Sequence, residues 1–198
     1  EQTVLFDQDY CQSETIKDGS SKDLIPEQAP EMQLPPVEVD LSGGTPPVFF
    51  HGDLPQKVLA FTFDDGPHKT ITNSILDTLE AFKIKANFFE VGNQVLRNPK
   101  ITQKVLEKGH EVGSHSWSHK KLTAELEKTA HAEILDGQKA ILDVLGTLAS
   151  PFFRFPYGAR NKALQEFVQN QNLATFFWNI DTLDWKHKNP KALYQYAL

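Results

Sequence analysis

The residues Phe-Thr-Phe-Asp-Asp-Gly-Pro at positions 61–67 decide the fold that we expect for this chain. They close a run, 58–63, that is apolar on both faces, as is typical of a strand covered on both sides. Gly66 and Pro67 end that strand, so Asp64 and Asp65 lie where it emerges. Because successive strand residues point to opposite sides, we expect the two acids to face different partners, one a metal and the other a water or a cation. The alternative is a solvated turn in which Asp65 caps a helix.

Length and composition indicate one globular domain with an appendage. The 198 residues are 39% hydrophobic and 11% aromatic, which is enough to bury a full core. No run of eighteen apolar residues occurs, so we expect no transmembrane segment. The chain begins at Glu1 without a charged and then apolar leader, which fits a cytoplasmic protein or a secreted one given without its signal. The single cysteine, Cys11, is interpreted as incidental.

Residues 1–56 differ from the rest in charge and in proline content. Residues 1–55 hold eleven acids against Lys17 and Lys22, giving −9, whereas residues 56–198 hold eighteen basic and fifteen acidic residues, giving +3. Seven of the twelve prolines fall in the same segment. We therefore expect an acidic, proline-rich N-terminal arm or linker, which is either an unstructured spacer or is docked through the apolar triplets 4–6 and 48–50. The remainder has no basic stripe, which argues against a nucleic-acid partner.

From residue 57 the sequence predicts alternating strands and helices. Strands are expected at 58–63, 85–91, 110–114, 151–156 and 173–180, and helices from Thr72 or Asn73 to 82, over 101–106, 123–145 and 161–170. Acids, histidines or an arginine follow each strand except the second, and few lie on the helices. Parallel α/β folds build sites at the C-terminal ends of strands. A complete or incomplete (β/α) barrel explains this spread over four strands better than an open doubly wound sheet does.

Two histidines, His115 and His119, stand four residues apart in the run His-Ser-Trp-Ser-His. This spacing places two imidazoles above one another on a helical turn. With Asp65 they supply two nitrogens and one oxygen, a ligand set that zinc and similar divalent ions bind while positions stay open for water and substrate. Such a histidine pair also arises by chance, but its place after a short strand favours a metal site. His68, in the turn after the acids, is a candidate for lining the cleft.

Four motifs resemble those of the polysaccharide deacetylases, carbohydrate esterase family four. They lie at 62–67, 115–119, 154–158 and 181–185, in the family's order and with similar separations. The resemblance covers about residues 57–190 and implies a distorted (β/α) barrel as the deacetylase domain, 57–198. It also implies metal-dependent removal of N-acetyl groups from N-acetylglucosamine units of peptidoglycan or a chitin-like polysaccharide. Such glycan substrates imply a protein outside the cytoplasm; the oligomeric state is left open.

The resemblance assigns roles to the metal ligands and the base. Asp65, His115 and His119 would bind one divalent ion, with zinc expected and cobalt, manganese or nickel as alternatives. Asp64 would be the general base for the metal-bound water that attacks the acetyl carbonyl. Arg154 resembles the arginine that pairs with this base, where a nearby opposite charge would hold the carboxylate ionised and oriented.

The resemblance also assigns the surroundings of the substrate. Tyr157 would offer its backbone N–H to the tetrahedral oxyanion. Trp185 would form a wall of the pocket for the acetyl methyl group, and Pro156 and His68 are further candidates for substrate binding. Asp184 matches the aspartate that orients a histidine of the family's fifth motif, Leu-x-His.

That fifth motif has no counterpart before Leu198. In the family its histidine protonates the leaving amine, a step typically worth ~10²–10⁴-fold in rate. We therefore expect a C-terminally incomplete chain, or else a natural short form with little activity. An O-acetyl polysaccharide esterase, whose leaving group needs the acid less, and a non-catalytic glycan-binding relative are the alternative functions. A metal-dependent phosphoesterase fits less well, because nothing resembles a second metal site.

Overall fold

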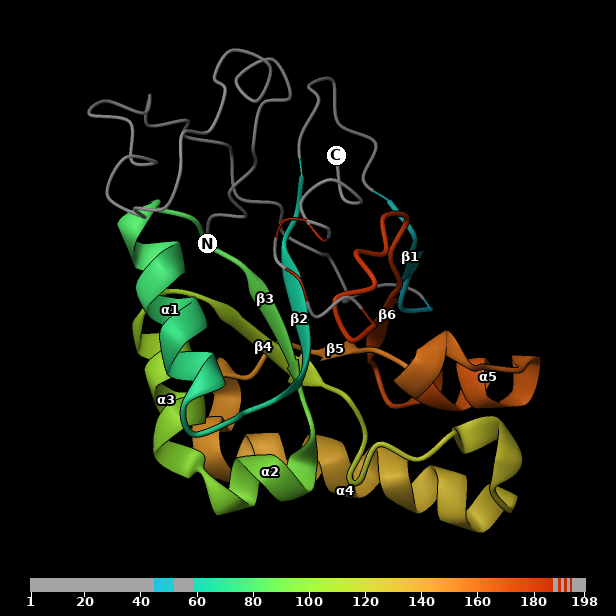
Figure 1. Ribbon diagram of the computed structural model, residues 1–198. Coiled ribbons are helices and arrows are strands. Elements are labelled where there is room, and N and C mark those ends of the chain that lie inside the picture. The colour runs from blue at the N-terminus through green and yellow to red at the C-terminus, as the bar shows by residue number, and fades with distance from the viewer. Residues whose placement is uncertain (1–44, 52–58, 187–188, 190, 192, 194–198) are drawn as a thin grey trace.

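The sheet is built from parallel strands (Figure 1). The computed structural model describes residues 45–51, 59–186, 189, 191 and 193. Its strands are β1 (Val48–Phe49), β2 (Thr62–Gly66), β3 (Asn87–Glu90), β4 (Glu111–Ser114), β5 (Phe152–Phe153) and β6 (Ala174–Phe176). Within these residues the strand order is β1-β6-β5-β4-β3-β2 and all five pairings are parallel. The expected α/β fold, an incomplete (β/α) barrel, is confirmed, with β1 and β2 as the edges of the described sheet.

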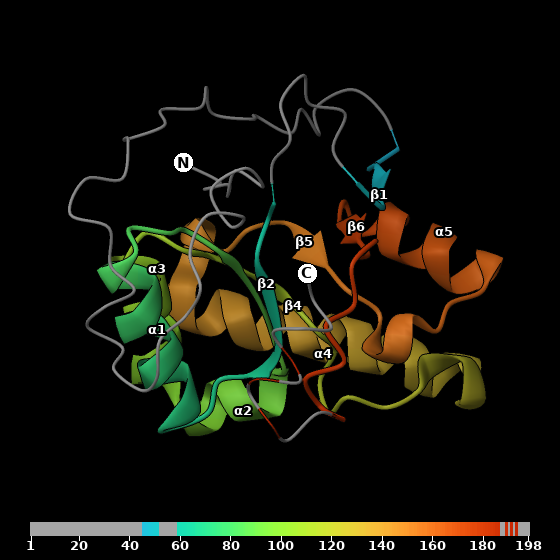
Figure 2. The same cartoon turned by 45° about the horizontal axis from the view of Figure 1, so that its top comes forward.

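The helices lie along the outer side of the curved sheet, as Figures 1 and 2 show from two directions. They are α1 (Ile71–Ala81), α2 (Gly92–Arg97), α3 (Pro99–Glu107), α4 (Glu127–Leu145) and α5 (Lys162–Asn170), with short 3-10 helices η3 (Leu122–Ala124), η4 (Gly146–Leu148) and η5 (Pro156–Gly158). The sequence did not predict α2, because only Gly92 and Val95 of its six residues are buried and no periodicity results. None of the described helices is both long and apolar enough to cross a membrane.

Three helix starts differ from the predicted ones, the first being that of α3, which begins at Pro99 rather than at 101. Helix α1 starts at Ile71, before the expected caps, because Thr72 is already buried and its hydroxyl accepts the His68 N–H at 2.9 Å. Helix α4 starts at Glu127 rather than at 123, after a separate 3-10 turn. Leu126, the residue before this start, is 81% exposed.

Helix α5 matches its predicted span. The side chain of Asn161 accepts the Leu164 N–H at 2.9 Å and caps the helix start.

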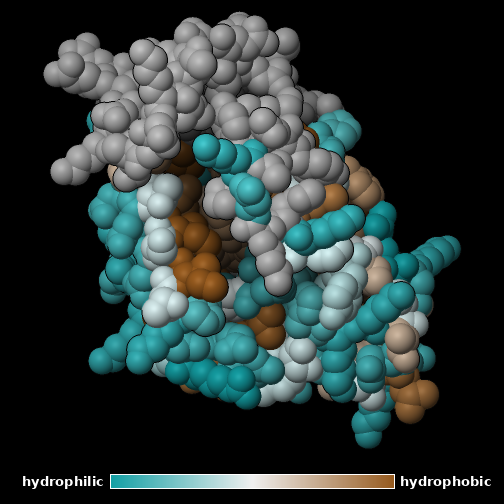
Figure 3. All heavy atoms as spheres, viewed as in Figure 1, coloured by the Kyte–Doolittle hydropathy of each residue, from teal (hydrophilic) through white to brown (hydrophobic). Residues whose placement is uncertain are grey.

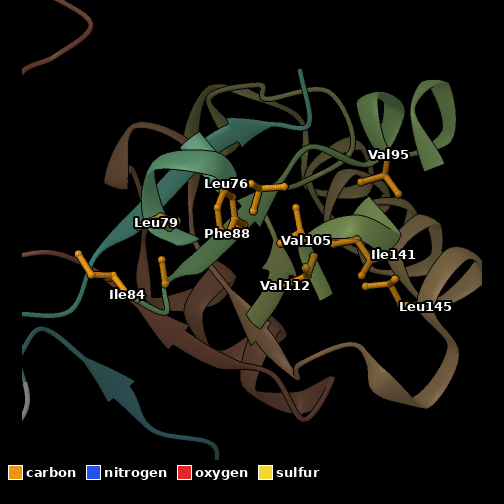
Figure 4. Close-up of a cluster of buried hydrophobic side chains, with 10 residues drawn as sticks. Leu76, Leu79, Ile84, Phe88, Val95, Val105, Val112, Ile141 and Leu145 are labelled. Atoms are coloured by element: carbon orange, nitrogen blue, oxygen red, sulfur yellow. The ribbon is translucent and has the colours of Figure 1, made fainter. Parts of the chain in front are cut away.

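Two hydrophobic clusters hold the helices to the sheet. Figure 4 shows the first in close-up, between the sheet and α1, α3 and α4, where Leu76, Val105 and Ile141 are fully buried. The second lies under α4 and α5 around Phe153 and Phe155, whose rings meet edge to face. Burial of each such side chain stabilises the fold by roughly 1.5–3 kcal/mol. These clusters fix the strand ends on which the site is built.

Strand β1 comes from the segment that the sequence assigns to the N-terminal arm. Val48 pairs with Thr175 and Phe49 with Phe176, whose ring stacks on that of Phe49 at 4.8 Å. This triplet is therefore docked, whereas residues 4–6 lie outside the described residues. At the other edge, a hollow lined partly by Phe63 lies between β2 and α1, where Figure 3 shows hydrophobic surface.

Candidate active site

The two acids at the end of β2 face the same histidine. Strand β2 loses its register with β3 between Asp64 and Gly66, and Asp65 has a left-handed backbone with φ of 68°. His115 Nε2 lies 3.8 Å from Asp64 Oδ2 and 3.5 Å from Asp65 Oδ1. Strand alternation, from which the prediction started, does not hold here, because a bulge interrupts β2 at this point. The predicted difference in partners is nevertheless present: Asp64 contacts the Arg154 cation, and Asp65 lies with His115 and His119. Aspartate adopts the left-handed conformation more readily than most residues do.

The histidine run 115–119 is a loop rather than the predicted helical turn. Ser116 and His119 have φ of 66° and 60°, which interrupts any helix. The loop nevertheless brings the rings of His115 and His119 together, with centroids 4.9 Å apart. His119 Nε2 lies 3.1 Å from Asp65 Oδ1. Proximity of the two rings therefore depends on the fold of this loop and not on helical spacing.

The ring of His115 is fixed in orientation and held neutral. Its side chain is 2% exposed, and its Nδ1 lies 2.8 Å from the backbone oxygen of Arg154. Because a carbonyl oxygen only accepts hydrogen bonds, Nδ1 carries the proton and Nε2 keeps a lone pair on the side of the two acids, where a cation can accept it. Burial lowers the pKa of His115, and the nearby charge of Asp64 opposes this shift. A neutral imidazole with a fixed tautomer is the form that metal ions bind.

Asp65, His115 and His119 form a cluster that can hold a metal ion. One ligand atom from each residue lies within 4.8 Å of the others. Tetrahedral zinc, with bonds of about 2.0–2.2 Å, sets its ligand atoms ~3.4 Å apart, close to the two distances from Asp65 given above. The donors therefore fit a divalent cation in both type and spacing.

Arg154 fixes the second acid. Its guanidinium donates to Asp64 Oδ1 and to Thr62 Oγ1, each at 2.7 Å. It also donates to the backbone oxygens of Phe176 and Phe177 at 3.2 Å. Burial lowers the pKa of Arg154, which Asp64 opposes, and a guanidinium stays protonated in proteins. Asp64 is thus held at one oxygen, while the other faces His115.

Comparison with known proteins identifies the family. The family model described as polysaccharide deacetylase matches residues 51–176, more than half of the chain. The chain belongs to the polysaccharide deacetylase family. The family that the motifs resemble is thereby confirmed, and three of the four motifs, at 62–67, 115–119 and 154–158, lie within the matched residues.

The chain is similar to proteins that are named as peptidoglycan deacetylases. It is 43% identical over 133 residues to peptidoglycan-N-acetylglucosamine deacetylase PgdA of Listeria monocytogenes, covering 67% of this chain and 28% of that protein. It is 36% identical over 191 residues to peptidoglycan-N-acetylmuramic acid deacetylase PdaC of Bacillus subtilis, covering 93% and 37%. The chain thus spans less than half the length of these relatives. The structure of Bdellovibrio bacteriovorus peptidoglycan deacetylase Bd3279 superposes with a TM-score of 0.71 at 35% identity, over 80% of this chain and 44% of that one.

Tyr157 lies beside the cluster of Asp65, His115 and His119 that can hold a metal ion. Its ring centroid is 4.6 Å from that of His119, and its side chain is exposed. It has φ of 59°, inside the 3-10 turn that starts at Pro156. A positive φ is unusual for so bulky a residue and marks a constrained backbone next to the site.

Among the described residues, no contact links the other predicted site residues to this cluster. His68 Nδ1 accepts the N–H groups of Thr70 and Ile71 at the start of α1. Asp184 accepts a hydrogen bond from Thr182 in an exposed turn, and Trp185 is 76% exposed. Their roles, like that of Pro156, stay predictions.

Sequence reasoning missed three residues that shape the site. Thr62 shares Arg154 with Asp64, and the Phe89 ring lies 4.0 Å from the guanidinium carbon. Thr62 stands two residues before Asp64, so strand alternation places both on one face. Glu133 lies among the buried positions of α4, and an acid in an apolar stripe was the available signal.

Proposed function

We propose that this chain carries the catalytic part of a metal-dependent enzyme that removes N-acetyl groups from N-acetylglucosamine units of peptidoglycan or a chitin-like polysaccharide. The observation that carries the proposal is the position of Asp64. One of its oxygens is bound by Arg154, and the other lies 3.8 Å from His115, a member of the metal-ligand cluster. The names of the relatives, PgdA and Bd3279, support a peptidoglycan substrate.

In this proposal the metal-binding residues and the general base have separate roles in hydrolysis. When bound by Asp65, His115 and His119, a divalent ion supplies Lewis acidity that acidifies water and polarises a carbonyl group. We propose zinc, with cobalt, manganese and nickel as alternatives. Asp64 takes the proton of the attacking water, and its contact with Arg154 keeps it in position.

The developing oxyanion needs a donor that is in place before the reaction. We assign this role to the backbone N–H of Tyr157, on the turn beside His119. Loss of a comparable donor raises the barrier by ~2.7–4 kcal/mol in other hydrolases. The constrained backbone at Tyr157 suits such preorganisation.

The sugar that bears the acetyl group has a second candidate. PdaC is named an N-acetylmuramic acid deacetylase, and this chain aligns with it over 191 residues. N-acetylmuramic acid, which carries a lactyl carboxylate next to the acetamide, is therefore the alternative substrate unit. Either unit belongs to peptidoglycan, so the proposal also places the protein outside the cytoplasm.

Acetate release tests the proposal. The protein is stripped of metal, reloaded with Zn²⁺ and incubated with peptidoglycan, with N-acetylglucosamine oligomers and with acetylated xylan. We expect acetate from the first or second substrate, none after chelation, and none from Asp65→Ala. Analysis of the deacetylated peptidoglycan for glucosamine and muramic acid identifies the sugar. Release from xylan alone would make the protein an esterase, and equal release by wild type and Asp65→Ala would reject the metal mechanism.

A further inference from the structure

Helix α4 is hydrogen-bonded to the loop that carries the two histidines. The carboxylate of Glu133 accepts the Ser118 backbone N–H at 2.7 Å through Oε2 and the Ser118 hydroxyl at 2.6 Å through Oε1. The backbone oxygen of Glu133 accepts the Trp117 N–H at 2.8 Å. One residue of α4 therefore binds two consecutive residues of the loop, directly before His119.

Close packing of helix backbone against the same loop further restricts its position. A Cβ built on Gly137, one turn further along α4, would lie 2.5 Å from the backbone carbon of Ser116. The N–H groups of Gly92 and Asn93 donate to the oxygens of Ser116 and Trp117 at 2.9 and 3.0 Å. Both α2 and α4 therefore contact the loop, and the two helices also pack against each other at Gly92 and Gly137.

The contacts with Glu133 restrict His119 because Ser118, which makes them, is joined to His119 by a peptide bond. His119 directly follows Ser118, and its own N–H donates to Ser116 Oγ at 3.1 Å. The left-handed backbone of His119 is an uncommon conformation that persists only where its surroundings determine it. Ser118, fixed at both its N–H and its hydroxyl, is the neighbour that provides this constraint.

The carboxylate of Glu133 is committed to these contacts. Its side chain is 6% exposed, and Lys120 Nζ approaches it only at 3.9 Å. A buried acid is tolerated where hydrogen bonds satisfy its oxygens, as they do here. It lies outside the metal-ligand cluster and has no part in the proposed chemistry.

We propose that Glu133 is a positioning residue that sets the place of His119 through Ser118 and thereby raises the affinity of the site for its divalent ion. The inference rests on the metal-binding role of the cluster in the proposed function. Groups of this kind, one shell out from the ligands, typically contribute 10–100-fold to metal affinity.

Zinc affinity measured by competition with a chelating dye tests the inference. Glu133→Ala removes both side-chain bonds and is expected to weaken Zn²⁺ binding ~10–100-fold. Glu133→Gln keeps an acceptor for the Ser118 N–H and a donor for its hydroxyl, so affinity should stay within about threefold of wild type. Asp136→Asn, an exposed acid on the same helix, is the charge-matched control and should leave affinity unchanged. Amide NMR signals of Ser118 and His119 in the zinc-free protein should move in Glu133→Ala and stay in place in Glu133→Gln.

The outcomes separate positioning from general stability. A merely structural role would lower the melting temperature of Glu133→Ala but leave the zinc affinity of its folded fraction intact, and this result overturns the inference. Equal weakening in Glu133→Gln and Glu133→Ala also overturns it, since charge rather than hydrogen bonding would then matter. If Glu133→Ala does not fold, Ser118→Ala removes the hydroxyl contact and leaves α4 intact; unchanged zinc affinity there counts against the inference. Wild type that binds zinc but releases no acetate would reject the proposed function alone.

Discussion

Arg154 Nη1 lies 2.7 Å from Asp64 Oδ1, although 90 residues separate the two in the sequence. Arg154 follows β5 and Asp64 belongs to β2, and two further strands, β4 and β3, lie between them in the sheet. In a flat sheet three strand spacings would set them ~14 Å apart, beyond the reach of an arginine. The contact therefore depends on the curvature of the sheet, and curvature is what assembles the site.

Asp64 and Asp65 are predicted to separate metal binding from turnover. Asp65→Asn should lose Zn²⁺ and activity together, because it removes the carboxylate ligand. Asp64→Asn should keep Zn²⁺ and lose activity ~10²–10⁴-fold, as expected for removal of a general base. Metal content by elemental analysis and acetate release are measured on the same samples. If Asp64→Asn emptied the site instead, the two roles would be reversed.

Arg154→Met should damage both the catalytic rate and stability. The variant leaves Asp64 and the oxygens of Phe176 and Phe177 without their donor. Breaking a buried ion pair typically destabilises by 3–5 kcal/mol, and partial exposure of Asp64 places this case at ~3 kcal/mol. Urea unfolding gives the stability, and kcat at saturating substrate gives the rate.

The matched control for this variant is Arg160→Met, whose guanidinium lies over Phe177 in an exposed position. It loses the same charge without touching Asp64. A kcat reduced equally by both substitutions would show that Arg154 acts only through net charge and not through its contact with the base.

Tyr157→Phe should change kcat very little. The group that we assign to the oxyanion is a backbone N–H, which the substitution retains, and the ring that packs against His119 keeps its size. We expect kcat within about threefold of wild type, far from the 10²–10³-fold loss that follows removal of an oxyanion donor. Steady-state kinetics on the preferred glycan measure this. A loss of a hundredfold would mean that the phenol hydroxyl itself takes part.

How much the sequence predicts depends on the range of the interactions that build each element. Helix α5 matched because its cap, Asn161, is local. Proximity of Asp65 to the histidines was also predictable, since strand ends meet on one face of a parallel sheet. The contacts of Arg154 with the backbone oxygens at the end of β6 and directly after it could not be predicted, because every residue has a backbone carbonyl whatever its type.

Two predictions about the site, strand alternation at Asp64 and Asp65 and a helical turn at 115–119, were wrong for a common reason. The bulge at Asp65 and the left-handed residues in the 115–119 loop are backbone conformations that local periodicity does not encode. Both are imposed by tertiary contacts, such as the hydrogen bonds from α2 to the oxygens of Ser116 and Trp117. Residue types thus indicated the candidate ligands, while their geometry could be seen only in the fold.

Gly137→Ala should destabilise, although alanine is the better helix former by about 1 kcal/mol. The added Cβ would meet the backbone of Ser116 at 2.5 Å, and backbone cannot move aside as a side chain does. Overpacking of this kind typically costs 1–3 kcal/mol, so the net change should be a loss. Zinc affinity should fall as well, because the displaced loop carries both histidines. Asp136→Ala, on the exposed side of the same helix, is the control; it should gain at most ~0.7 kcal/mol from helix propensity and leave zinc affinity unchanged. A stabilised Gly137→Ala would contradict the close packing.

Glu90 should give the protein a stability that declines as pH rises. The side chain is fully buried at the end of β3, its Oε2 accepts the Thr102 hydroxyl at 2.6 Å, and burial raises its pKa from 4.5 to about 7, opposed by that bond. The folded state therefore holds a proton that the unfolded state releases near pH 4.5. The resulting contribution of Glu90 to the free energy of unfolding is fully present below pH 4.5 and is lost as pH rises through about 7. It amounts to ~3 kcal/mol at most.

Glu90→Gln, which keeps the acceptor for Thr102 without a titratable charge, should remove this decline. Urea unfolding of the metal-free protein between pH 5 and 8 should show a flatter profile for Glu90→Gln, which becomes more stable than wild type at the alkaline end. Glu107→Gln, an exposed acid on α3, is the control and should follow wild type. Parallel profiles for wild type and Glu90→Gln would mean that Glu90 is already ionised in the folded protein, and its unpartnered Oε1 would then need a cation or water that satisfies it.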